Sequence, residues 1–165
     1  MVKTYYYYYD KEEDITTFCE LDEELYCLRA TFQTANGIFS TNSPLTPAHL
    51  FLPEGSFLDF IDELSPISQE QFKDKWNISN KKYLIHWENL KNKYQINQSI
   101  KTSISFFPPL GVIVQFGEIF YGLVNYNDCK AILGENQMYP HQQIQLYIEH
   151  FDDDNLWIKF STKSN

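Results

Sequence analysis

The sequence is poor in positive charge. Its 165 residues carry 13 Lys and Arg side chains against 22 Asp and Glu, which gives a net charge of −9. A polyanion such as RNA is repelled by a surface of this sign unless the few cations are clustered. The charge balance therefore disfavours RNA as a partner and favours a protein partner of basic character.

Signals for catalysis, metal binding and membrane insertion are also missing. The sequence contains no Walker loop, GxSxG elbow or HExxH pair, so we expect neither an enzyme nor a small-molecule cofactor. The four His residues are not spaced with carboxylates as metal ligands, and we predict no metal site. The chain begins without a signal-type apolar stretch, and no window approaches about 18 uncharged apolar residues. We therefore expect a cytoplasmic protein without a membrane partner.

Cysteine is scarce, and its three copies include no Cys-x-x-Cys pair. Cys19 and Cys27 lie on neighbouring strand-like runs, where a disulfide is sterically conceivable. The odd count and the lack of a secretion signal favour reduced cysteines that serve as small core residues.

The first part of the chain predicts an antiparallel meander. Four runs rich in Tyr, Thr, Ile and Phe span residues 4–10, 15–21, 25–32 and 37–41, with acidic or Asn-Gly turns between them. Alternation within five consecutive tyrosines puts Tyr5, Tyr7 and Tyr9 on one face and Tyr6 and Tyr8 on the other. Ligand stacking is one use for these rings, but a strand packed on both faces is the simpler interpretation.

Two helices are predicted after a proline-containing loop over residues 42–55. Ser68 and Gln71 have the capping-box spacing, and Phe72 and Trp76 lie one turn apart on the face that follows. A second helix begins near residues 79–80 and carries a stripe with the spacing of a buried face: Tyr83, Trp87, Leu90 and Tyr94. Helix-to-sheet packing explains this stripe, and a partner groove is the alternative.

Three segments in the last third have the order and spacing of a small β-barrel. They read GVIVQFG at 111–117, YGLVNYND at 121–128 and FDDDNLWIKFS at 151–161. This pattern resembles the S1-type RNA-binding domain, a five-stranded barrel of the oligonucleotide-binding (OB) class. The resemblance implies five antiparallel strands over residues 96–161 and a short helix near 128–133. Gly111 and Gly122 should lie on strands, at points where a side chain would collide or where the barrel bends.

The predicted fold is therefore α+β in two parts. Residues 1–95 form an α+β domain, an antiparallel meander with two helices. Residues 96–165 form a five-stranded S1-like OB β-barrel. Few Gly and Pro residues occur near 94–99, which favours a short, stiff joint between the two parts.

The resemblance also marks the positions at which S1-type domains contact RNA, and this chain differs at most of them. Leu110 and Ile113 stand where the family has two Phe residues. Asn125 replaces a His and Trp157 replaces an Arg, whereas Asp152 keeps the family's Asp, which is expected to cap the backbone of a turn. Base stacking contributes roughly 1–3 kcal/mol per base, so losing both Phe removes much of the expected affinity. From residue 96 onward, four Lys stand against seven Asp and Glu, a net charge of −3.

Two sets of candidate binding residues remain. The candidate ligand face of the barrel comprises the aromatic and polar residues at or near the family's contact positions: Phe106, Phe120, Tyr121, Asn125, Asp152 and Trp157. Trp157 is either an exposed interface hot spot or a residue that turns inward. The candidate basic cluster comprises the lysines near the second helix: Lys81, Lys82, Lys91 and Lys93. Glu88 interrupts this cluster, so a solvated helix face is its simpler interpretation.

Three function classes fit these observations. The first, which we favour, is a non-enzymatic protein that engages a basic protein partner through its barrel, in the manner of acidic immunity proteins, antitoxins or adaptors. The second is a weak single-stranded RNA binder that stacks bases on Phe106, Tyr121 and Trp157. The third is a structural barrel within a larger assembly. The electrostatic potential of the barrel face separates the first two classes.

Overall fold

The chain folds into two compact units. The computed structural model describes residues 2–53 and 55–163. The N-terminal unit comprises the residues up to Thr41 together with Thr46–Lys82, and the barrel unit comprises Asn42–Leu45 and the residues from Tyr83 onward. The predicted boundary between residues 95 and 96 assigned the second helix to the first part of the chain. In the structure, this helix belongs to the barrel unit, which includes the residues from Tyr83 onward.

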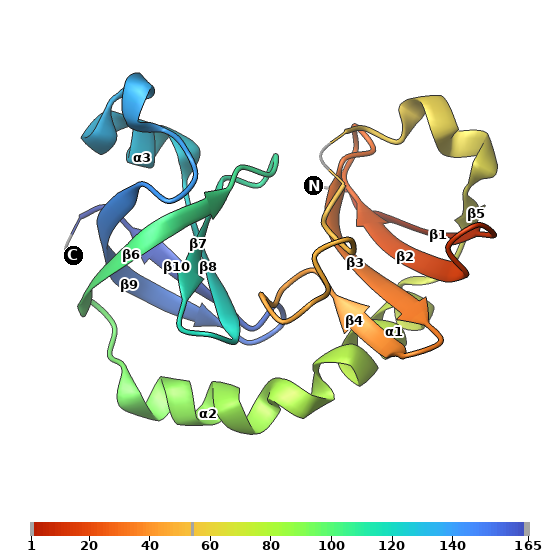
Figure 1. Ribbon diagram of the computed structural model, residues 1–165, viewed down its shortest axis with the longest axis horizontal. Helices are drawn as coiled ribbons and strands as arrows, with labels where there is room; N and C mark the ends of the chain where they lie inside the picture. Colours follow the sequence, from red (N-terminus) through yellow and green to blue (C-terminus); the bar gives the residue numbers. More distant parts are fainter. Residues whose placement is uncertain (1, 54, 164–165) are drawn as a thin grey trace. The chain divides into compact units, whose positions relative to one another are not determined.

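The N-terminal unit is built on a five-stranded antiparallel sheet in the order β4-β3-β2-β1-β5 (Figure 1). Its strands are β1 (Thr4–Asp10), β2 (Ile15–Leu21), β3 (Cys27–Thr34), β4 (Gly37–Ser40) and β5 (Ser65–Pro66). The first four strands agree with the predicted meander to within two residues. Gly37 has φ +136°, a backbone conformation that favours glycine, at the start of β4.

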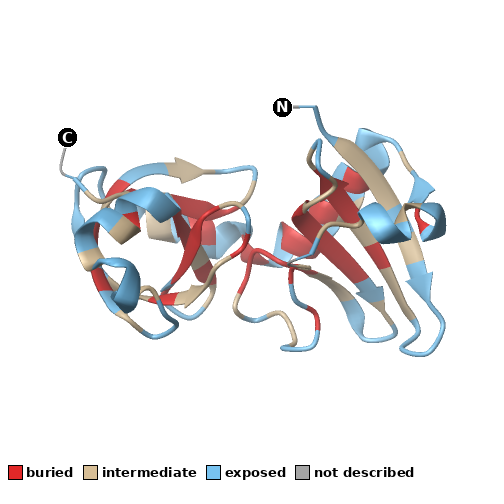
Figure 2. Ribbon diagram, turned by 90° about the horizontal axis from the view of Figure 1, so that it is seen from above, coloured by how far each residue is buried: buried red, intermediate tan, exposed pale blue. Residues whose placement is uncertain are grey.

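The tyrosine run of β1 packs on both faces of the sheet. Tyr6 and Tyr8 pack with the cluster formed by buried residues of β2, β3 and the loop that follows β4. On the other face, the Tyr5 ring centroid lies 5.5 Å from that of Phe72. Figure 2 shows buried residues along the strands of this unit. The interpretation of this run as a structural strand is thus supported.

Helix α1 (Gln69–Asn80) covers one face of the sheet. The predicted capping box is present, because the Ser68 hydroxyl accepts from the Gln71 backbone and the Gln71 side chain accepts from the Ser68 backbone. Phe72 and Trp76 are buried one turn apart. Residues 46–53 and 55–64, which include the 3-10 helix η1 (Leu58–Glu63), lie against the other face through Leu50, Leu52 and Leu64.

The barrel unit contains a closed five-stranded barrel in the order β10-β8-β7-β6-β9. Its strands are β6 (Ser99–Phe106), β7 (Val112–Phe116), β8 (Phe120–Val124), β9 (Gln143–Asp152) and β10 (Trp157–Ser161). The prediction that all strands are antiparallel is wrong for one pair, because β10 and β8 run parallel. Helix α3 (Tyr126–Leu133), η3 (Glu135–Gln137) and β9 lie between β8 and β10, and this long crossover permits a parallel pairing.

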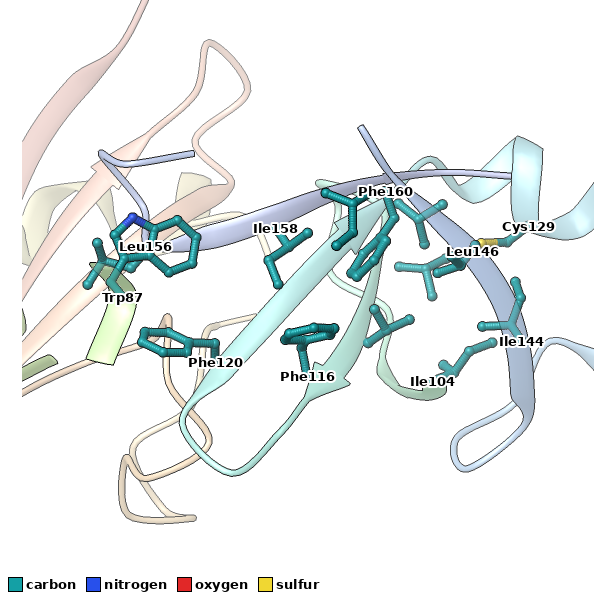
Figure 3. Packing of buried hydrophobic residues seen from close by; sticks show 14 of the residues in the cluster. Trp87, Ile104, Phe116, Phe120, Cys129, Ile144, Leu146, Leu156, Ile158 and Phe160 are labelled. Carbon is teal, nitrogen blue, oxygen red and sulfur yellow. The ribbon is translucent and has the colours of Figure 1, made fainter. Parts of the chain in front are cut away.

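A helix residue closes each end of the barrel core. Trp87 of α2 (Leu84–Lys93), which follows η2 (Lys81–Tyr83), lies beside Phe120 at one end, with 5.2 Å between ring centroids (Figure 3). Cys129 of α3 lies near Leu146 at the other end (Figure 3). The stripe on the second helix packs against the barrel core: Tyr83 and Trp87 are buried, and Leu90 and Tyr94 are partly buried.

Two glycines permit close packing in the barrel, as predicted, but Gly122 lies on a strand, β8, whereas Gly111, also predicted on a strand, does not. A Cβ on Gly122 would lie 2.2 Å from the Phe160 ring, and a Cβ on Gly111 would lie 2.6 Å from the carbonyl oxygen of Val124. Gly111 precedes β7 with φ +143°. Cys19, Cys27 and Cys129 are free and buried. No helix among the described residues is long and apolar enough to cross a membrane.

A buried ion cluster links the sheet to α1. Glu20 is 1 % exposed and accepts hydrogen bonds from Arg29 Nη2 at 2.7 Å and from Lys3 Nζ at 2.8 Å. The Arg29 guanidinium carbon lies 5.2 Å from the ring centroid of Phe72 and 4.9 Å from that of Trp76. Burial raises the pKa of Glu20, but the hydrogen bonds from Arg29 and Lys3 outweigh it and hold the pKa below 4.5.

We expect Glu20→Gln to destabilise the N-terminal unit by about 3 kcal/mol at neutral pH, because Arg29 stays buried without its carboxylate. In the unmodified protein, the stability contributed by ionised Glu20 is complete above its unfolded pKa. It is lost as pH falls through 4.5 toward the lower folded pKa. The variant should lose this part of the acid dependence. Urea unfolding followed by circular dichroism at a series of pH values measures both effects.

Glu24→Gln is the matched control, since Glu24 is exposed in the turn between β2 and β3. This change should stay within about 0.5 kcal/mol. Equal free energies of unfolding for the two variants would contradict a stabilising ion cluster.

Candidate functional site

The candidate site is the outer face of the barrel formed by β7, β8 and β10. These are the second, third and last strands of the barrel, and OB folds bind their ligands on the face of strands two and three. Side chains alternate across each strand, so Ile113, Leu123 and Trp157 point away from the barrel core and form a separate apolar cluster. We call this cluster the outer floor.

The outer floor is buried. Ile113, Leu123 and Trp157 are 0 %, 9 % and 4 % exposed. The indole Nε1 of Trp157 donates to the backbone carbonyl of Asn42 at 3.2 Å, and the Asn42 side chain donates to the carbonyl of Asn155 at 2.8 Å. Trp157 is therefore neither an exposed hot spot nor part of the barrel core, since it packs outside the barrel against the chain's own backbone.

A half-buried rim borders the outer floor. It consists of Phe106, Leu110 and Tyr121, which pack against the floor and remain partly exposed. The rings of Phe106 and Tyr121 meet edge to face, with centroids 5.5 Å apart and planes at 83°. The β6–β7 register shifts between Ile104 and Phe106, which turns Phe106 outward although Ile104 lies in the core. Burial raises the pKa of Tyr121, so its phenol is neutral at physiological pH.

One lysine lies on this face, and its charge is engaged. Lys159 Nζ lies 3.8 Å from Asp152 Oδ2 and 5.5 Å from the ring centroid of Trp157. Burial lowers the pKa of Lys159, and the nearby Asp152 carboxylate opposes this effect. The face therefore offers apolar and aromatic area with little net charge.

The other predicted ligand-face residues have structural contacts. Phe120 does not lie on the outer face, because alternation along β8 turns it into the barrel core while Tyr121 points out. The Asn125 side chain caps α3 by accepting from the backbones of Asn127 and Asp128. Asp152 accepts from the Asn155 backbone at 3.1 Å, so the expected turn cap is confirmed.

The predicted lysine cluster is divided between the two units. Lys81 and Lys82 belong to the N-terminal unit, where Lys82 Nζ lies 5.0 Å from the ring centroid of Phe39. Lys91 bonds to Asp153 at 2.7 Å and to Glu88 at 2.9 Å, in a cluster that also includes a 2.6 Å hydrogen bond from Trp87 Nε1 to Asp153. Hydrogen bonds from Lys91 and Trp87 hold the pKa of Asp153 below its usual value.

Lys93 lines a groove that the sequence did not indicate. The groove, of about 640 Å³, runs between α2 and the barrel, where β6 and β7 separate beyond the Ile104–Val114 pair. Thr102 bridges this gap by donating to the Gln115 carbonyl. Lys101 and Glu118 also line the groove, together with the rings of Tyr94 and Phe116. Strand separation has no periodic signature, so residue spacing alone could not have predicted it.

Replacing the buried indole tests the closure of the outer face. We expect Trp157→Ala to reduce the free energy of unfolding by about 3–5 kcal/mol, because it empties the space of a nearly fully buried ring. Trp157→Phe should cost less but should still lose the hydrogen bond to Asn42, which contributes about 1 kcal/mol. Denaturant unfolding of the full chain measures both.

Tyr139→Ala serves as control, because Tyr139 is an aromatic residue of the same unit that is 46 % exposed. Its effect should stay near 0.5 kcal/mol. If Trp157→Ala were equally mild, the indole would not be a packing residue.

Comparison with known proteins assigns no family or function to this chain. The chain matches no protein-family model, no curated protein and no solved structure. The structure itself establishes an α+β chain with an antiparallel N-terminal sheet and a closed five-stranded barrel, which is compatible with an OB-like barrel.

Proposed function

We propose that the protein is a non-enzymatic binding protein whose barrel, of the S1 type, engages a protein partner at the rim of its outer face. The observation that carries this proposal is the edge-to-face pair of Phe106 and Tyr121 beside a buried apolar floor. Protein interfaces concentrate aromatic residues and exclude charge at their centres. Hot-spot residues commonly sit next to such well-packed, desolvated surroundings.

The charges of the outer face support a protein partner over RNA. An S1-type RNA face needs cations to neutralise phosphates, and Lys159 already interacts with Asp152 and the Trp157 ring. Trp157, which replaces the family's Arg, is buried and offers no free ring face for a base. The rim therefore offers an apolar contact area, but the described residues around it do not provide a set of cations that could contact phosphate groups.

The net charges of the two units point to a partner of basic character. The N-terminal unit carries seven Lys and Arg against fourteen Asp and Glu, a net charge of −7, and the barrel unit carries six against eight, a net charge of −2. Complementary charge speeds association and suppresses wrong partners. A role like that of an acidic immunity protein, antitoxin or adaptor follows from this combination of acidic surface and apolar rim.

Partner capture from native cytoplasm tests the proposal. The tagged full chain should recover the same protein with and without nuclease treatment. Tyr121→Ala should weaken its capture by on the order of 2 kcal/mol, or about thirtyfold, because it removes half of the aromatic pair. Quantitative binding to the recovered protein measures the change, and circular dichroism verifies that the variant is folded.

Tyr139→Ala is again the matched control and should bind normally. Capture that disappears with nuclease, or that is insensitive to Tyr121→Ala, would contradict a protein-binding rim.

Weak RNA binding is the second candidate function, and the groove beside α2 is the observation that favours it. Lys93, Lys101 and the Tyr94 ring combine positive charge with an aromatic surface there. Two lysines are among the described residues that line the groove, so a single-stranded RNA oligomer should bind no tighter than about 10⁻⁴ to 10⁻⁶ M at physiological salt. Submicromolar affinity with a steep salt dependence, lost in Lys93→Gln/Lys101→Gln, would make RNA the primary ligand.

A further inference from the structure

A second candidate binding site lies in the N-terminal unit, on the sheet face opposite α1. It is a pocket of about 480 Å³ whose floor is formed by Tyr8, Thr17 and Phe32. These three residues are directly opposite one another on β1, β2 and β3. The loop after β4 supplies one wall of the pocket: His49, Leu50, Phe51, Pro53 and Phe57.

Aromatic rings dominate the interior of this pocket. The rings of Tyr8 and Phe57 have centroids 6.0 Å apart and are tilted by 48°. Phe51 is 66 % exposed, so a large ring is held in water at the wall of the pocket. The face of an aromatic ring carries partial negative charge and attracts a cation within about 6 Å of its centroid.

The rim of the pocket is acidic. Asp10 and Glu13 line it from the hairpin between β1 and β2, and no Lys or Arg occurs among the described lining residues. Asp10 Oδ1 accepts from the backbones of Glu12 and Glu13, which fixes this carboxylate at the end of β1. The unit's net charge of −7 reinforces this local potential.

We propose that this pocket binds an Arg or Lys side chain from a basic segment of a protein partner. The aliphatic stem of such a side chain would pack on Phe57 and Leu50, as long basic side chains do on apolar surfaces. Its cationic head would lie near the aromatic rings and the carboxylates of Asp10 and Glu13. Charge complementarity selects this occupant, because a neutral apolar ligand would leave the carboxylates unused and an anion would be repelled.

This inference extends the proposed function by naming the chemistry of the partner. It concerns a site on the N-terminal unit that shares no residue with the barrel's outer face, so the two proposals can fail separately. Loss of partner capture in Tyr121→Ala reports on the barrel, and binding of a basic peptide reports on the pocket.

Fluorescence anisotropy with the full chain and a short fluorescein-labelled peptide of alternating Arg and Leu tests the pocket. We expect saturable binding that weakens as salt rises, because the contributing charges are partly exposed. Asp10→Asn/Glu13→Gln should weaken it by roughly tenfold, since each exposed charge pair contributes up to about 1 kcal/mol. Asn keeps the Oδ1 acceptor of Asp10, so the turn should remain folded.

Glu12→Gln is the matched control for charge. Glu12 belongs to the same hairpin but does not line the pocket, so its neutralisation should change the affinity less than twofold. Phe51→Ala should weaken binding several-fold, whereas Phe60→Ala should not, because Phe60 is 56 % exposed and lies outside the pocket lining.

The peptide itself provides the remaining control. Replacing each Arg by the neutral isostere citrulline should abolish most of the binding. Equal affinity for the citrulline peptide, equal effects of Glu12→Gln and Asp10→Asn/Glu13→Gln, or no binding of the Arg peptide would each overturn the proposal.

Discussion

The hydrogen bond between the Trp157 indole and the Asn42 carbonyl, with the apolar floor around it, determines what the barrel can present to a ligand. Through this contact a segment just after β4, more than a hundred residues away in sequence, packs on the outer face of the last barrel strand. At the position that the sequence resemblance assigned to an Arg of S1-type domains, this chain has the Trp157 ring, which is 4 % exposed. The rim residues Phe106 and Tyr121 are partly exposed aromatic area beside this buried floor.

A second tryptophan fixes the other side of the barrel unit. Trp87 closes one end of the core against Phe120, and its Nε1 shares Asp153 with Lys91. In OB folds, the loop between strands four and five contributes to ligand binding. The hairpin between β9 and β10 connects the fourth and fifth strands of this barrel. Because Asp153 of this hairpin is bonded to α2, a loop that OB folds use for recognition has a structural role here. Each of the two indoles therefore stabilises one part of the barrel surface, and the rim is a partly exposed aromatic area beside Trp157.

Local patterns predicted much of this architecture, and long-range contacts account for what they missed. The strands, the Ser68–Gln71 capping box and the buried stripe on α2 follow from residue spacing, which acts over a few residues. Spacing identified the buried side of α2 but could not identify the barrel as its partner. The outward turn of Phe106 depends on a register shift, and the burial of Trp157 depends on Asn42. The acidic aromatic pocket was missed because its floor and wall come from β1, β2, β3 and a distant loop.

The central claim, that the rim contacts protein and not RNA, is tested most directly by photo-crosslinking in native cells. Replacing Tyr121 with the photoreactive analogue benzoylphenylalanine places the probe in the rim while keeping an aromatic ring against Phe106. We expect irradiation to produce one discrete protein adduct that survives nuclease, with no such adduct when the probe replaces Tyr139. Adducts that carry RNA and collapse on nuclease treatment would contradict the account.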